Sequence, residues 1–177
     1  QTWSLAAANS TDDCLFGDVN ADGHPDFVAA YQSGTVFLGD GAGGFLNADG
    51  NLPAGGNLGR SGIALGDVDN DGDLDLSFKV AGGAFQVWLW NGSGVWVNAS
   101  AGLPTSGIAA TQLADMDGDG WCDAIGLGNG LLRIWLGNGG TAWTPAAQIT
   151  FPTPGYFAAL RAGGDVDHNG RPDLAVV

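Results

Sequence analysis

The sequence contains no glutamate and few basic residues. All 19 of its acidic residues are aspartate, and only five lysines and arginines accompany them, so the formal net charge of the 177 residues is -14. Phosphate binding requires clustered cations, and we therefore expect no nucleic-acid partner. A solvated acidic surface would use both acids, whereas the shorter aspartate is a common turn residue. The exclusive use of aspartate therefore indicates carboxylates that are held in tight turns.

Long uninterrupted apolar runs are also missing. None approaches the ~20 residues that a membrane-spanning helix requires, so we expect no membrane insertion. With 45% hydrophobic residues, the chain can nevertheless form a core. Its 32 glycines disfavour long helices and favour short strands that are joined by glycine-containing turns. The sequence predicts an all-β fold.

One Asp-rich segment occurs four times, and we number the copies loops 1 to 4. They span residues 18–26, 67–75, 115–123 and 165–173, which places their first aspartates 48–50 residues apart. A period near 50 is typical of β-propeller blades with four antiparallel strands each. Short apolar runs and glycine-rich turns follow each copy. We therefore expect each unit to contain four strands, with the Asp-rich loop between the first two.

The spacing also predicts the domain organisation. Residues 1–177 form one partial propeller with whole blades near 15–50, 62–100 and 108–147 and a partial blade over 157–177. Residues 1–8 resemble the outer strand of a neighbouring blade. We expect a piece of a larger propeller, completed by remaining blades of the same or another chain. Assembly of several chains into a ring and a closed four-blade ring with unpaired edges stay open as alternatives.

The loops carry the residue types that calcium prefers, in the pattern Asp-x-Asp/Asn-x-Asp/Asn-Gly-x-x-Asp. Calcium takes six to eight oxygen ligands, and side chains at positions 1, 3 and 5 of a curled loop converge. Position 7 offers its backbone carbonyl, the aspartate at position 9 offers two oxygens, and the glycine at position 6 permits the sharp turn. The predicted ligands are Asp18, Asn20, Asp22, His24 and Asp26 in loop 1, Asp67, Asp69, Asp71, Asp73 and Asp75 in loop 2, Asp115, Asp117, Asp119, Trp121 and Asp123 in loop 3, and Asp165, Asp167, Asn169, Arg171 and Asp173 in loop 4.

Metal-free turns are the alternative, because Asp and Gly also favour ordinary turns. However, 15 of the 19 aspartates lie in the four loops. Without cations, each loop would hold several carboxylates close together, which costs free energy at neutral pH. An EF-hand would need glutamate at position 12, and the chain has none. We therefore predict about four bound Ca²⁺.

This pattern resembles the FG-GAP/VCBS repeat family, whose calcium-loop blades occur in integrin α-subunits, bacterial surface proteins and some fungal lectins. The resemblance covers nearly the whole chain. It implies a seven-bladed propeller, structural calcium, and an extracellular or cell-surface location. Our main hypothesis is a binding or adhesion module with a protein or glycan ligand on the propeller face. A calcium-dependent lectin with pockets between blades and a lyase- or dehydratase-type propeller enzyme are the alternatives.

Other residues give weaker expectations. The chain has no nucleophile elbow, phosphate-binding loop or Ser/His/Asp arrangement, so we expect no catalytic residues and no enzyme. Cys14 and Cys122 lie two units apart, which predicts unpaired thiols because a disulfide needs Cα atoms within about 7 Å. Four tryptophans recur at equivalent strand positions and are expected to pack between blades, whereas Trp90 and Trp121 are expected as exposed contacts. Glycosylation sequons begin at Asn9, Asn91 and Asn98.

Overall fold

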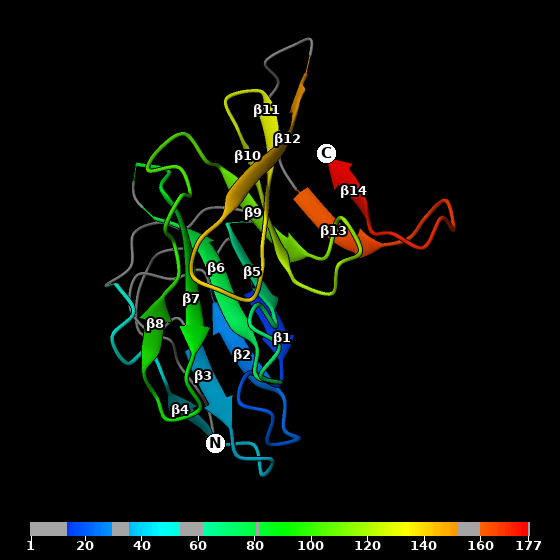
Figure 1. The fold of residues 1–177 in the computed structure, drawn as a ribbon. Coiled ribbons are helices and arrows are strands. Elements are labelled where there is room, and N and C mark those ends of the chain that lie inside the picture. The colour runs from blue at the N-terminus through cyan, green and yellow to red at the C-terminus, as the bar shows by residue number, and fades with distance from the viewer. Residues whose placement is uncertain (1–13, 30–35, 54–61, 81, 152–159, 177) are drawn as a thin grey trace.

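The computed structural model describes residues 14–29, 36–53, 62–80, 82–151 and 160–176 (Figure 1). Over these residues the chain forms 14 strands and no helix, which confirms the predicted all-β class. Accordingly, no helix in the described part is long and apolar enough to cross a membrane. The outer strand predicted for residues 1–8 lies outside the described residues.

The strands form four antiparallel sheets, and the neighbours within each sheet follow chain order. Sheet 1 contains β1 (Cys14–Gly17), β2 (Asp26–Ala29), β3 (Val36–Gly39) and β4 (Phe45–Asn47). Sheet 2 contains β5 (Ile63–Gly66), β6 (Asp75–Lys79), β7 (Phe85–Trp90) and β8 (Trp96–Asn98). Sheet 3 contains β9 (Ala110–Ala114), β10 (Asp123–Gly128), β11 (Leu131–Leu136) and β12 (Thr144–Thr150). Sheet 4 contains β13 (Leu160–Gly164) and β14 (Asp173–Val176). The predicted four-stranded antiparallel unit is therefore confirmed in sheets 1 to 3.

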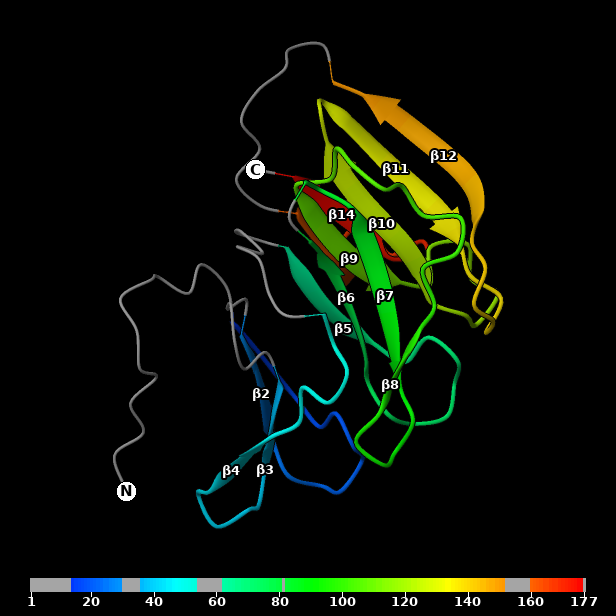
Figure 2. The same ribbon diagram turned by 90° about the vertical axis from the view of Figure 1, so that its left-hand side faces the viewer.

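Neighbouring sheets meet through their first strands, because β1 contacts β5, β5 contacts β9, and β9 contacts β13. Figure 2 shows the sheets one after another in chain order. A separate apolar cluster fills each space between sheets. Val28 and Ile63 lie between sheets 1 and 2, Phe85 and Trp135 between sheets 2 and 3, and Leu160 between sheets 3 and 4. Each such buried side chain contributes roughly 1.5–3 kcal/mol, so the sheets stabilise one another.

Small residues in the first strands allow this close approach. A Cβ atom at Gly66, the last residue of β5, would lie 2.9 Å from the Cβ of Leu113 and 3.3 Å from the Sγ of Cys122. Cys122 belongs to loop 3, so a loop side chain of one sheet packs against the preceding sheet. Cys14 and Cys122 are both free, as predicted. Burial raises the pKa of the Cys122 thiol to about 11.

Tryptophans connect the sheets at their outer strands. Trp96 is 1% exposed, and its indole N–H donates to the backbone oxygen of Ala48 in the preceding unit, at 2.9 Å. Trp143 repeats this contact with the oxygen of Ala99, at 2.6 Å. The prediction that the recurring tryptophans pack between units is confirmed for these two and for Trp135, which is 5% exposed.

The expectation that Trp90 is an exposed contact is wrong. Its side chain is 3% exposed and lies edge-on to Trp96, with ring centroids 4.9 Å apart. Trp88 and Trp90 are two residues apart on β7 and therefore point to the same face of the sheet. Both belong to the apolar cluster between sheets 1 and 2. Trp90 is buried because it lies on the face of β7 that meets sheet 1. Comparison of equivalent positions between the repeats does not reveal this.

We expect Trp96→Phe to lower the free energy of unfolding by about 1–3 kcal/mol, because the Ala48 carbonyl between the sheets loses its donor. Trp88→Phe is the matched control, since the Trp88 indole N–H donates only to Gln86 on its own strand. Urea denaturation of both variants measures the difference. Equal losses in the two variants would contradict the role of the inter-sheet hydrogen bond.

Candidate metal sites

Each loop connects the first two strands of its sheet, and all four share one backbone conformation. The glycine at position 6 has a positive φ in every loop, as predicted, at Gly23, Gly72, Gly120 and Gly170. Position 4 also has a positive φ in every loop, which sequence reasoning missed. The residues at this position are Ala21, Asn70, Gly118 and His168. Because four different residue types occupy position 4, no single residue type marks the left-handed conformation in the sequence.

The backbone of each loop curls around its first aspartate, whose carboxylate accepts hydrogen bonds from backbone N–H groups later in the loop. The Asp18 carboxylate accepts from the backbone N–H groups of Asp22 at 3.0 Å and Gly23 at 2.8 Å. Asp165 accepts in the same way from Asn169 and Gly170. The equivalent acceptors in the other loops are Asp115, bonded to Gly118, Asp119 and Gly120, and Asp67, bonded to Gly72. This local folding brings position 1 near position 3, together with position 5 in loop 2 and with position 9 in loops 3 and 4.

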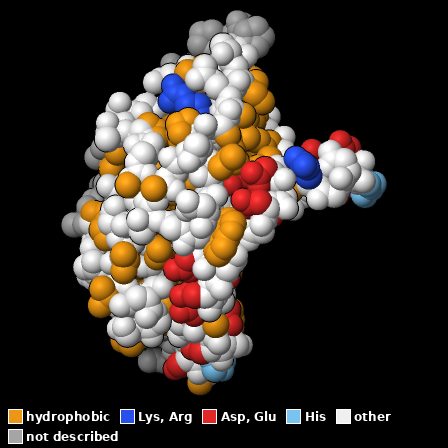
Figure 3. Space-filling view, viewed as in Figure 1, with side chains coloured by type: hydrophobic (Ala, Val, Ile, Leu, Met, Phe, Trp, Pro, Cys, Tyr) orange, Lys and Arg blue, Asp and Glu red, His pale blue; other side chains and the backbone are white. Residues whose placement is uncertain are grey.

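Three loops hold carboxylate clusters in which one oxygen from each residue lies within 4.8 Å of the others. The clusters are Asp67, Asp69 and Asp71 in loop 2, Asp115, Asp117 and Asp123 in loop 3, and Asp165, Asp167 and Asp173 in loop 4. Loop 1 has three aspartates, as loop 4 does, but its position 3 is the amide Asn20, and its aspartates form no such cluster among the described residues. Figure 3 shows aspartate side chains gathered along one side of the molecule.

The aspartate at position 9 has a second role that was not predicted. Asp26, Asp75 and Asp123 are each 0% exposed, and both oxygens of each carboxylate accept backbone hydrogen bonds. In Asp75, one oxygen accepts from Val68 of the loop at 2.7 Å, and the other from Trp90 on the third strand at 2.9 Å. The equivalent backbone donors are Val19 and Gly39 for Asp26, and Met116 and Gly137 for Asp123. We call this arrangement the aspartate clamp, because it joins the loop to the second and third strands.

Several loop oxygens have no donor among the described residues. The Oδ1 atoms of Asn20, Asp67 and Asp69 are buried without a hydrogen-bond partner. A buried acceptor left unpaired costs about 1–3 kcal/mol, and more if it is charged. A hard cation would coordinate these oxygens. Every side-chain atom that the clusters offer as a ligand is likewise an oxygen. The residues present therefore fit a calcium-type cation.

Burial and neighbouring carboxylates raise the pKa values of several carboxyls in loops 2 and 3. Burial, followed by the charge of Asp71, raises the pKa of Asp69. Burial raises the pKa of Asp75 to about 7, although the two clamp hydrogen bonds act in the opposite direction. The pKa of Asp123 is raised by burial as well. A bound cation would favour the ionised forms and lower these pKa values.

In loops 1 and 3 the side chain at position 7 lies over the turn between the third and fourth strands. The ring of His24 contacts Gly41, and the ring of Trp121 contacts Gly139, both of which have positive φ. Trp121, expected as an exposed contact, is half-buried in this position. The loop and the turn thus support each other at the same end of the sheet.

A family model for an FG-GAP-like repeat matches residues 3–78 and 115–176. These ranges include all four loops. The chain belongs to the FG-GAP-like repeat family. The resemblance predicted from the Asp-rich pattern is therefore confirmed, and the FG-GAP-like repeats indicate a β-propeller-like module.

In EDTA, we expect the free energy of unfolding to decrease as the pH rises from about 5 to 8. The folded-state pKa of Asp75, about 7, lies above the ordinary value of 3.8 for an aspartate, so between these values the folded chain holds a proton that the unfolded chain has released. The stability from this proton is complete below pH 3.8 and is lost as the pH rises through 7.

Asp75→Asn is the control for this pH dependence. Asparagine keeps an oxygen in the clamp but does not titrate, so the decrease in stability between pH 5 and 8 is expected to become smaller. Chemical denaturation at a series of pH values measures it. An unchanged slope in the variant would show that Asp75 is not the group responsible.

Proposed function

We propose that this FG-GAP-like chain is an extracellular calcium-binding propeller module that holds a protein or glycan ligand on its face. The observation that carries the proposal is the set of carboxylate clusters in loops 2, 3 and 4, with unpaired buried oxygens on Asp67 and Asp69. Family membership adds a repeat architecture in which each loop occupies the same place in its sheet.

Calcium suits these loops better than other cations do. Zinc and copper favour histidine and cysteine ligands, whereas the clusters consist of aspartates alone. Magnesium demands near-ideal octahedral geometry and keeps several waters, whereas calcium accepts six to eight oxygens in flexible arrangements. Four Ca²⁺ would change the formal net charge from -14 to -6. The ions would remove the repulsion that the clustered carboxylates impose on each loop.

The calcium ions would have a structural role. Loops 1, 2 and 3 lead directly into the aspartate clamp, so an ion that fixes one of these loops also fixes the positions of the second and third strands. The aspartates with raised pKa values are Asp69, Asp73, Asp75 and Asp123. All four lie in the loops, where they serve as candidate ligands or clamps rather than as general acids. We therefore propose a binding role and not a catalytic one.

The described tryptophans give no separate support to the lectin alternative. Sugar rings stack on exposed aromatic faces, but the described tryptophans are buried or half-buried. The ligand surface is accordingly proposed to be the propeller face, and either a protein or a glycan would be held there. Remaining blades of the same or another chain would complete that face.

Thermal unfolding with and without calcium tests the proposal. We expect saturating Ca²⁺ to raise the melting temperature relative to EDTA, because each site that binds only the folded chain adds about 2.7 kcal/mol at 100 times its Kd. Equimolar Mg²⁺ is expected to have a smaller effect. The variant Asp67→Ala/Asp69→Ala is the control and should respond less to calcium than the unaltered chain. Identical melting curves in Ca²⁺ and EDTA would refute structural calcium.

A binding screen tests the ligand. The calcium-loaded chain is presented to a glycan array and, separately, to immobilised extracellular-matrix proteins. Retention that EDTA abolishes on either surface supports the proposed binding role, and the surface that retains the chain identifies the ligand class. A folded, calcium-loaded chain that both surfaces fail to retain would contradict it.

A further inference from the structure

Two hydrogen bonds connect neighbouring loops. The backbone N–H of Leu74 in loop 2 donates to the backbone oxygen of Val19 in loop 1, at 2.9 Å. The side-chain amide of Asn70 in loop 2 donates to the backbone oxygen of Gly120 in loop 3, also at 2.9 Å. Loop 2 is thus bonded to the loops on both sides of it.

The residues in these two contacts all lie between candidate ligands in the sequence. Val19 stands between Asp18 and Asn20, and Leu74 between Asp73 and Asp75. The remaining two are Asn70, between Asp69 and Asp71, and Gly120, between Asp119 and Trp121. A cation that draws these ligands together therefore also positions a residue that is bonded to the next loop.

We propose that loops 1, 2 and 3 bind cations cooperatively, with loop 2 as the connection, and that loop 4 binds independently. This proposal rests on the calcium binding proposed above. Repulsion between carboxylates opens an empty loop, whereas a cation closes it. A closed loop 2 holds the backbone of its neighbours near their binding conformation. The second ion then finds a site that is already partly ordered, which is a coupling free energy between sites.

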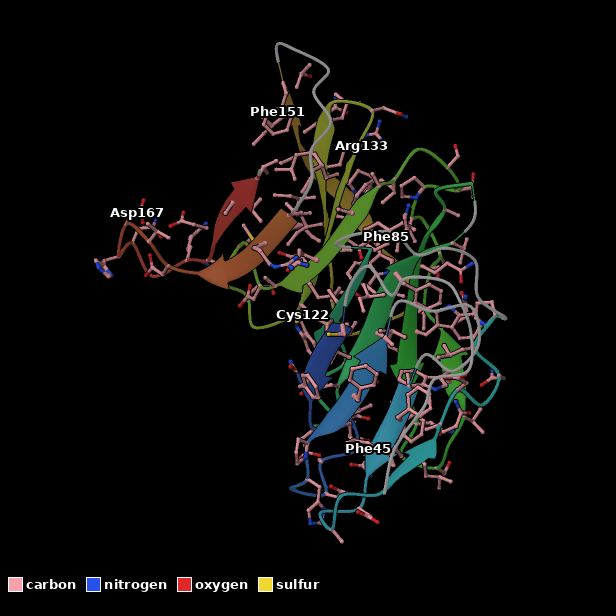
Figure 4. The ribbon with its side chains drawn as sticks, turned by 180° about the vertical axis from the view of Figure 1, so that it is seen from behind. Phe45, Phe85, Cys122, Arg133, Phe151 and Asp167 are labelled. Atoms are coloured by element: carbon pink, nitrogen blue, oxygen red, sulfur yellow. The ribbon has the colours of Figure 1, made fainter. Side chains whose placement is uncertain are left out.

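Loop 4 differs from the coupled loops in its surroundings. Val166, at position 2 of loop 4, is 80% exposed, whereas Val19 and Val68 at the same position are 0% and 1% exposed. Among the described residues, no hydrogen bond joins loop 4 to another loop. Figure 4 shows Asp167 on the segment between β13 and β14, which projects away from the other loops. Loop 4 is therefore the internal control.

Loop 3 contains its own reporter of occupancy. Tb³⁺ is a hard cation that replaces Ca²⁺ at oxygen sites and luminesces when a nearby indole is excited. Trp121 is at position 7 of loop 3 and is the only tryptophan in any of the four loops. Luminescence that Trp121→Phe abolishes therefore measures Tb³⁺ in loop 3. Circular dichroism of each variant verifies that the chain is folded.

The central comparison uses two variants of loop 2. Asp69→Ala removes a candidate ligand, and we expect it to weaken Tb³⁺ binding in loop 3 about fivefold, at the lower end of usual coupling strengths. Asn70→Gly keeps every candidate ligand, and glycine adopts the φ of 58° at position 70 without strain. The substitution removes only the side-chain hydrogen bond to the backbone oxygen of Gly120. We expect a similar loss of affinity from it. Combining the two substitutions should weaken loop 3 no further.

Two matched variants complete the design. Ala21→Gly alters the same position in loop 1, which has a φ of 53°, and should leave Tb³⁺ binding in loop 3 unchanged. Asp167→Ala removes from loop 4 the ligand that corresponds to Asp69, and it should also leave loop 3 unchanged.

The outcomes separate this proposal from the proposed function. Normal Tb³⁺ affinity in loop 3 of the Asn70→Gly variant overturns the coupling, as does a loss that simply adds to that of Asp69→Ala. An equal loss from Asp167→Ala would overturn the independence of loop 4. If the unaltered chain shows no Tb³⁺ luminescence and no stabilisation by Ca²⁺, calcium binding itself is refuted.

Discussion

The aspartate clamp is the interaction on which the rest of each unit depends. A single buried carboxylate satisfies one backbone donor of the loop and one at the end of the third strand, while its own residue begins the second strand. These donors would otherwise be buried and unpaired, which costs free energy for each one. The repetition of this arrangement at Asp26, Asp75 and Asp123 explains why the three complete sheets have the same internal geometry.

The clamp also determines the electrostatics of the loops. It holds a carboxylate in a buried position beside other aspartates, so the pKa of Asp75 is raised by burial and by the charges of Asp69 and Asp71. Among the described residues, hydrogen bonds and carboxylate charges act on Asp75, and no cationic side chain is among the causes of its pKa shift. The clamp therefore concentrates negative charge in the loop, and in the proposed function an ion would balance that charge. On this proposal, stability and cation binding depend on the same arrangement.

Much of the fold could be predicted from the sequence, because the period near 50 residues and the glycine at position 6 both have direct physical causes. The four antiparallel strands and the free cysteines followed from that period. The positive φ at position 4 could not be predicted, since Ala21 and Asn70 do not share a side-chain property that requires it. The burial of Trp90 was missed because it depends on which face of β7 meets the neighbouring sheet. The second role of Asp75 required knowledge of where the third strand ends.

The packing of Cys122 has a practical consequence for studying this molecule. Its sulfur lies against Gly66 of the preceding sheet, and the raised pKa of the thiol disfavours the reactive thiolate. The Cys122 side chain is half-buried, so looser packing between sheets 2 and 3 would expose more of its sulfur. A change in the rate at which a thiol reagent modifies Cys122, after correction for the exposed Cys14, therefore reports a change in the packing between these sheets. The chain thus contains a natural probe of the contact between its repeats.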